Sequence, residues 1–128
     1  MKENIKNHTS KAKEYFLEKV SFCAQPKELN NMIKDNIKDI NIIDVRTYDE
    51  YIDGHIPFAV HIPMHDLEGH LAMLHKDMIN IIYCHCNYCN YAYHAAYFFA
   101  SKGYPVMVLN GGIKVWKELE YDIVKTSV

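Results

Sequence analysis

The sequence has no long apolar run and little arginine. No stretch approaches the roughly 20 apolar residues that a membrane helix needs, and the N-terminal segment MKENIKNHTSKAKEYF lacks the apolar core of a signal peptide. The formal net charge is -2 and the lysines are scattered, so no basic stripe is available for a nucleic-acid backbone. These absences predict a cytoplasmic protein that binds neither membranes nor nucleic acid.

The 128 residues are 49% hydrophobic, which is enough to bury one core. Apolar residues at helical spacing predict helices over 11–22 and 25–39, the second carrying Leu29, Ile33 and Ile37 on one face. Short apolar runs at 40–45, 60–63, 80–83 and 105–112 alternate with helical segments. This order is typical of an α/β domain whose central, mainly parallel sheet is covered by helices on both faces.

Cysteine is scarce, yet three of the four cysteines, Cys84, Cys86 and Cys89, lie within six residues. A reducing cytoplasm disfavours a disulfide clasp and leaves catalysis or metal binding. Cys84 directly follows an apolar strand, at the end of the strand where α/β proteins bind ligands, and Asn90 is the predicted N-cap of the next helix. Backbone N–H groups of the loop and the helix dipole would stabilise a thiolate there, so we expect a lowered pKa for Cys84.

Two further stretches carry a family resemblance. IIDVRTYDEYIDGHIPFAVHIP (42–63), and IIYC with its six-residue loop, a helix and GYPVMVLNGGIKVWKE, resemble the two halves of a rhodanese domain over roughly 25–120. The matching motif residues are Asp44, Arg46, Glu50, Gly54, His55, Gly111, Gly112 and Trp116. The resemblance implies a helical extension over 1–24 and a single rhodanese-like domain over 25–128.

For function, the resemblance implies a sulfurtransferase that needs no cofactor. Cys84 would accept a sulfane sulfur as a persulfide and pass it to a thiol, to cyanide or to a protein thiol partner. The active-site loop would comprise His85, Cys86, Asn87, Tyr88, Cys89 and Asn90, with N–H groups from 85–90 cradling the persulfide.

The loop CHCNYC departs from the common rhodanese pattern, which carries glycine and a basic residue. Arg46 is the only arginine of the chain and belongs to the first motif, so His85 is the only candidate cation in the loop. We therefore expect thiosulfate to be a poorer sulfur donor than a persulfide or polysulfide. Related phosphatases close a longer loop with an arginine, where this chain has Asn90, which argues against phosphatase activity.

Two alternatives stay open for the same loop. Cys86 or Cys89 could act as an accessory thiol that resolves an oxidised or persulfidated Cys84, which would make the protein a redox or persulfide sensor. The thiols could instead bind zinc in a module without turnover.

Structural roles are expected for several conspicuous residues. Asp44 and Arg46 read as an ion pair, His55 as a partner of loop backbone, and Cys23 as a buried small residue. Gly111 and Gly112 are expected in a turn that approaches the active loop closely. Tyr88 and Tyr91 are the candidates for a substrate rim.

Overall fold

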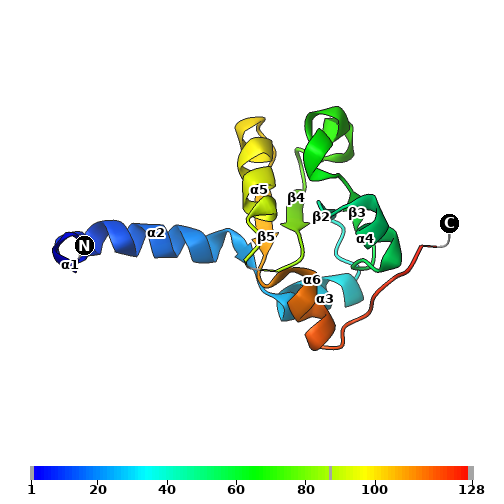
Figure 1. Cartoon of the computed structure of the whole chain (residues 1–128), viewed down its shortest axis with the longest axis horizontal. Helices are drawn as coiled ribbons and strands as arrows, with labels where there is room; N and C mark the ends of the chain where they lie inside the picture. The colour runs from blue at the N-terminus through cyan, green and yellow to red at the C-terminus, as the bar shows by residue number, and fades with distance from the viewer. Residues whose placement is uncertain (1, 87, 127–128) are drawn as a thin grey trace.

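The computed structural model describes residues 2–86 and 88–126. Its centre is a parallel sheet in the order β1-β5-β4-β2-β3 (Figure 1). The strands are β1 (Cys23–Ala24), β2 (Ile40–Asp44), β3 (Val60–His61), β4 (Ile79–Tyr83) and β5 (Val106–Leu109). Every pair runs parallel, with Ile42 beside Ile81 and Ile82 beside Val108. The carboxyl ends of all five strands therefore face the same edge of the sheet.

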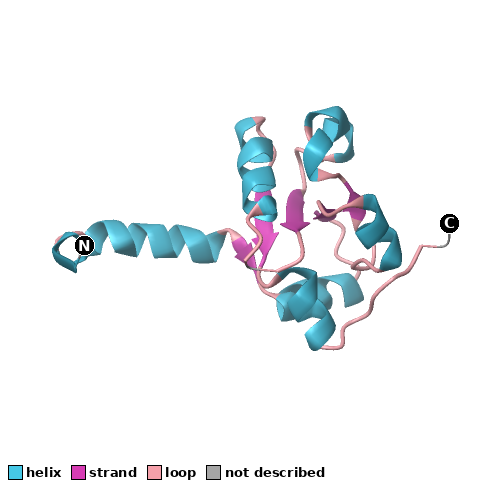
Figure 2. Cartoon of the chain, viewed as in Figure 1, coloured by secondary structure: helices cyan, strands magenta, loops and turns pink. Residues whose placement is uncertain are grey.

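Helices connect these strands (Figure 2). They are α1 (Lys2–Lys6), α2 (Thr9–Ser21), α3 (Pro26–Lys34), α4 (Tyr48–Asp53), α5 (Tyr91–Ser101), α6 (Gly112–Glu118) and the 3-10 helices η1 (Met64–Asp66) and η2 (Glu68–Met73). Within the described ranges, no helix is both long and apolar enough to cross a membrane.

Both faces of the sheet are buried, because neighbouring residues of a strand point to opposite sides. Ile42 and Ile81 pack on one face in a core that includes Trp116 of α6 and Leu29 of α3. Their neighbours Ile43 and Ile82 pack on the other face in a core that includes Phe99 of α5. The expected fold, a mainly parallel sheet with helices on both sides, is confirmed.

The expected positions of the elements also agree with the structure, with two corrections. The helix expected over 25–39 ends at Lys34, because the chain turns through a left-handed conformation at Asn36 (φ 54°). Ile37 therefore lies outside the helix and is 46% exposed. The edge strand β1 was missed, because two residues are too few to show a period.

The N-terminal part of the chain is positioned differently from the other helices. The helix α2 projects away from the sheet as an extended arm, and α1 lies at its far end (Figure 1). None of the residues Thr9–Ser21 is buried. The expected helix over 11–22 is thus present, but its apolar residues do not enter the core of this chain.

Candidate active site

Cys84 lies at the carboxyl edge of the sheet, directly after β4 and beneath the start of α5. Backbone hydrogen bonding continues past the strands here, since the Val45 N–H donates to the Tyr83 carbonyl oxygen at 3.1 Å. The Cys84 side chain belongs to the core that contains Ala92 of α5, and the residue is only 3% exposed. The predicted nucleophile thus lies at the ligand-binding edge, but its sulfur is almost fully covered.

The loop surrounds the Cys84 sulfur with acceptors as well as donors. The Cys84 thiol donates to the Cys89 carbonyl oxygen at 3.3 Å and approaches the Cys86 carbonyl oxygen at 3.7 Å. Burial raises the pKa of Cys84 to about 11; the N–H groups of Ala92 and Cys86 act in the opposite direction, and the neighbouring Cys89 thiol raises it further.

The expectation of a lowered Cys84 pKa is therefore wrong for this conformation. The helix dipole and the N–H donors stabilise the thiolate, but the loss of its hydration on burial destabilises it by more, so the pKa rises. The expected cradle of N–H groups from 85–90 is found only in part: the Cys86 N–H faces the sulfur, a further N–H comes from Ala92, and the Cys86 and Cys89 carbonyl oxygens also contact the sulfur.

The first turn of α6 holds the loop in place through two backbone hydrogen bonds. The Ile113 N–H donates to the Cys84 carbonyl oxygen at 3.0 Å, and the Lys114 N–H donates to the His85 carbonyl oxygen at 2.9 Å. Gly112 has a φ of +61°, and a Cβ atom there would lie 2.6 Å from the Cys84 carbonyl oxygen. The expectation of a close approach to the active loop is confirmed for Gly112, whereas a Cβ atom at Gly111 would meet the Val115 side chain of α6.

A cavity of about 560 Å³ opens beside the loop. Its wall includes Arg46, Glu50, His65, His85, Cys89 and Tyr91. Cys89, which is half-buried, therefore contributes to the cavity wall next to the buried Cys84. His65 was missed by the sequence analysis; it follows β3, so its place at this edge depends on the strand order, which the sequence alone did not provide.

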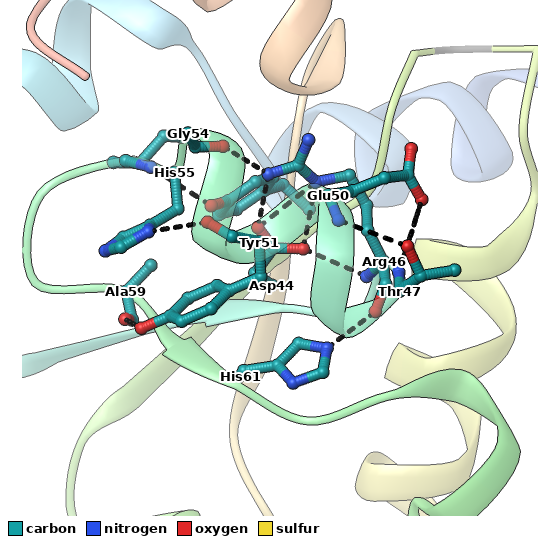
Figure 3. A network of polar contacts seen from close by, with 11 residues as sticks. Asp44, Arg46, Thr47, Glu50, Tyr51, Gly54, His55, Ala59 and His61 are labelled. Carbon is teal, nitrogen blue, oxygen red and sulfur yellow. Dashed lines mark hydrogen bonds and ion pairs between the residues drawn. The ribbon is translucent and has the colours of Figure 1, made fainter. Parts of the chain in front are cut away.

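Arg46 lines the cavity but is held in a structural ion pair. Its guanidinium donates to both carboxylate oxygens of Asp44, at 2.7 and 3.1 Å, and to the Gly54 carbonyl oxygen at 2.6 Å (Figure 3). Both Asp44 and Arg46 are buried. The expected structural role of this pair is confirmed, and the positive charge of Arg46 is largely balanced.

Two histidines complete this network. His55 donates from Nδ1 to the Tyr51 carbonyl oxygen at 2.9 Å, as expected of a residue that fixes backbone, and His61 Nε2 lies 2.7 Å from the Arg46 carbonyl oxygen (Figure 3). The Tyr51 ring stacks between them, with centroids 4.0 and 5.0 Å away. These contacts support the strand ends that carry the cavity.

Glu50 supplies a carboxylate to the cavity wall. Burial acts to raise its pKa, but hydrogen bonds from the Thr47 hydroxyl and backbone N–H, and the charge of Arg46, lower the pKa below its usual value. The same Thr47 hydroxyl accepts from the Glu50 N–H at 3.3 Å, which caps α4. Glu50 is therefore ionised at neutral pH, at an exposed position on the cavity wall that His85 shares.

The remaining predicted residues fall in several environments. Asn90 is the N-cap of α5, and Cys86 is half-buried. Tyr91 lines the cavity, whereas Tyr88 is 91% exposed. Asn87 lies outside the described residues.

Two residues away from the loop were also assigned from the sequence. Trp116 is a core residue whose indole N–H donates to the Asp122 carbonyl oxygen at 2.9 Å. Cys23 is partly exposed in β1, which corrects the expectation of a buried residue.

The zinc alternative gains no support from this arrangement. Among the residues that the structure describes, no group of three or more His, Cys, Asp or Glu side chains has the geometry to hold a metal ion. All four cysteines are free.

The structure is therefore an open parallel α/β domain that carries a cysteine at the end of its central strand. Comparison with known proteins gives the family: residues 25–119 match the model of the Rhodanese-like domain. The chain belongs to the rhodanese-like family.

Relatives of known sequence agree with this assignment. The chain is 34% identical over 80 residues to a protein of Allochromatium vinosum named Sulfurtransferase, a match that covers 62% of this chain and 73% of that protein. It is 35% identical over 79 residues to the HTH-type transcriptional regulator Rv0324 of Mycobacterium tuberculosis, where the match covers 62% of this chain and only 35% of the regulator. The shared region thus occurs in proteins with different names and lengths.

A solved structure shares both fold and sequence. The BH2092 protein from Bacillus halodurans superimposes with a TM-score of 0.84 at 32% identity, covering 91% of this chain and 86% of that one. The alignment leaves out fewer residues than the segment 1–24 contains, so part of the N-terminal arm has a counterpart there.

Proposed function

We propose that the protein is a sulfurtransferase whose Cys84 carries a sulfane sulfur as a persulfide. The observation that carries the proposal is the position of this thiol: it follows the central strand of a rhodanese-like domain, under the N-terminus of α5, beside an open cavity. A relative named Sulfurtransferase supports the same class of activity. A cytoplasmic location, which keeps thiols reduced, is part of the proposal.

The first transfer step displaces a thiol from the donor. The Cys84 sulfur attacks the outer sulfur of a perthiol R–S–SH, the donor S–S bond breaks, and the proton of Cys84 ends on the departing thiol RSH. In the second step an acceptor thiolate attacks the outer sulfur of Cys84–S–SH, the S–S bond breaks, the acceptor leaves as a perthiol and the Cys84 thiolate is released. Each step exchanges one S–S bond for another and needs no external oxidant or reductant.

The cavity favours a persulfide or polysulfide over thiosulfate as the donor. Thiosulfate carries two negative charges, and the Glu50 carboxylate on the cavity wall repels an anion. Arg46, whose charge would offset this repulsion, is paired with Asp44. A donor with less charge gives up less hydration free energy on entering the cavity and is repelled less by Glu50.

The test is intact-protein mass after brief incubation with thiosulfate or, separately, with glutathione persulfide. We expect a gain of one sulfur atom with glutathione persulfide, less with thiosulfate, reversal by cyanide, and no gain in Cys84→Ser. Cys23→Ser is the matched control, because Cys23 lies on β1 outside the loop, and it should gain sulfur normally. A variant lacking Cys84 that still gains the sulfur refutes the assignment.

A second function, redox sensing, is favoured by the position of Cys89: its carbonyl oxygen accepts from the Cys84 thiol at 3.3 Å, and its thiol is near enough to raise the pKa of Cys84. Peroxide would convert one thiol to a sulfenic acid with loss of water, and the other thiol would displace a second water to form a disulfide. Peptide mapping after mild peroxide should then give a Cys84–Cys89 disulfide rather than Cys84–Cys86. Oxidation that leaves Cys84 as a sulfinic acid contradicts this second function.

A further inference from the structure

The arm formed by α1 and α2 exposes an unusual amount of apolar side chain. Tyr15, Phe16, Leu17 and Val20 of α2 are between 53% and 73% exposed, and Ile5 of α1 is 66% exposed. The arm projects from the sheet (Figure 1), and its base, from Tyr15 onward, faces α5 and β5 across a cavity. Isolated helices this short are marginal in water, so the arm needs a partner to stay helical.

One face of α2 forms a seam between two cavities that share Tyr15. A cavity of about 330 Å³ near the tip includes Ile5, Lys11, Ala12 and Tyr15 in its wall. A second cavity of about 410 Å³ at the base shares Tyr15 and adds Glu18 and Phe22, with Tyr93 of α5 and residues of β5 opposite.

The residues along this seam follow the spacing of a paired helix. Along α2, the residues Ala12, Tyr15 and Lys19 and the C-cap residue Phe22 lie in the walls of the two cavities and follow one another at intervals of three, four and three residues. This is the spacing by which one helix packs along another.

The charges on the seam identify what covers it. Lys11 lies in the tip cavity and Glu18 in the base cavity, seven residues apart on one face. When two arms lie antiparallel, Lys11 of each falls opposite Glu18 of the other, so the pair forms twice about a two-fold axis. Lys19, the other cation of the base cavity, already lies over the Tyr93 ring at 5.4 Å within its own chain.

The same alignment fits the apolar residues. It sets Ala12 of one arm against Tyr15 of the other, a small residue facing a large one. We propose that a second copy of this chain covers the arm, with the two α2 helices packed antiparallel along this seam.

Sedimentation equilibrium of the full chain over a wide concentration range tests the proposal. We expect a dimer that dissociates on dilution. Lys11→Glu and Glu18→Lys should each weaken it about tenfold, because each change sets like charges together at two symmetric places. The double variant should restore the wild-type dissociation constant. Lys11 and Glu18 are about 10 Å apart along one helix, so this rescue cannot arise within one chain.

Two apolar variants form a matched pair. Ala12→Glu places a charge at a half-buried position in the seam and should give monomers, whereas Leu17→Glu places the same charge at an exposed position off the seam, 67% exposed, and should leave the dimer intact. Circular dichroism and the alkylation rate of Cys84 report whether each variant is folded.

A wild-type protein that is monomeric at every concentration overturns the proposal, and means that the arm is covered by a different partner. Failure of the double variant to restore dimerisation, or equal effects of Ala12→Glu and Leu17→Glu, also overturns it. None of these readouts depends on sulfur transfer, so the result is independent of the proposed activity.

Discussion

Replacing Gly112 by alanine probes how the active loop is held in place. The new Cβ would lie 2.6 Å from the Cys84 carbonyl oxygen, and ordinary contact begins near 3.4 Å, so the loop and α6 must separate by about 0.8 Å. This separation stretches the two hydrogen bonds from Ile113 and Lys114 to the loop, each worth about 0.5–1.5 kcal/mol. The left-handed conformation of Gly112 adds about 1–2 kcal/mol for any residue with a Cβ.

The expected loss of unfolding free energy is therefore about 2–5 kcal/mol for Gly112→Ala, measured by urea denaturation. Gly103→Ala is the matched control, because Gly103 has a φ of +90° and a Cβ there would have no heavy atom within 4 Å. It should lose only the conformational part, about 1–2 kcal/mol. The alkylation rate of Cys84 should rise in Gly112→Ala and stay unchanged in Gly103→Ala. Equal losses in the two variants, with Cys84 reactivity unchanged in both, would refute the argument that Gly112 acts through contact with the loop.

Three further predictions concern the same region. Iodoacetamide should modify Cys84 at a rate that rises with pH up to about pH 11. At pH 8 only about one Cys84 thiol in a thousand should be ionised. An inflection of the rate at the free-thiol pKa of 9.0 would contradict the burial argument. Because the folded pKa of Cys84 exceeds the unfolded one, its contribution to stability is fully present below pH 9 and is lost between about pH 9 and 11, which urea titrations across that range should detect. Arg46→Leu should lower the free energy of unfolding, measured by urea denaturation, by about 3–5 kcal/mol, because it leaves the Asp44 carboxylate buried without its partner. Thr47→Ala should lower it by about 1 kcal/mol, because it removes the cap of α4. A loss for Arg46→Leu no larger than that for Thr47→Ala would contradict the assigned strength of the ion pair.

Much of the fold was accessible from the sequence, because the signals are local. The apolar runs ending at Asp44 and Tyr83 mark strands buried on both faces, and Pro26 marks the start of a helix. The glycine pair at 111–112 indicated a close approach to the cysteine loop, and Gly112 makes it, because a Cβ atom there would collide with the loop backbone. The position of Cys84 at the end of a strand followed from the same patterns.

The environment of Cys84 could not be obtained in this way. Its pKa depends on how completely the sulfur is covered and on which carbonyl oxygens face it, and both follow from packing against α5 and from the loop conformation. The sequence showed the favourable terms, a helix start and backbone N–H groups, while the larger desolvation term exists only in three dimensions. His65 reached the cavity for a similar reason, since the order of the strands brings the end of β3 to the same edge as the loop.

The arm separates most clearly what the sequence determines from what the tertiary structure determines. The sequence determined that residues 11–22 form a helix and spaced its apolar residues along it, because helical periodicity is a property of neighbouring residues. Only the tertiary structure decided that this helix stands away from the sheet and leaves those residues exposed. The spacing of apolar residues predicts that a helix has an apolar face, whereas the surface that covers this face depends on how the elements pack in three dimensions.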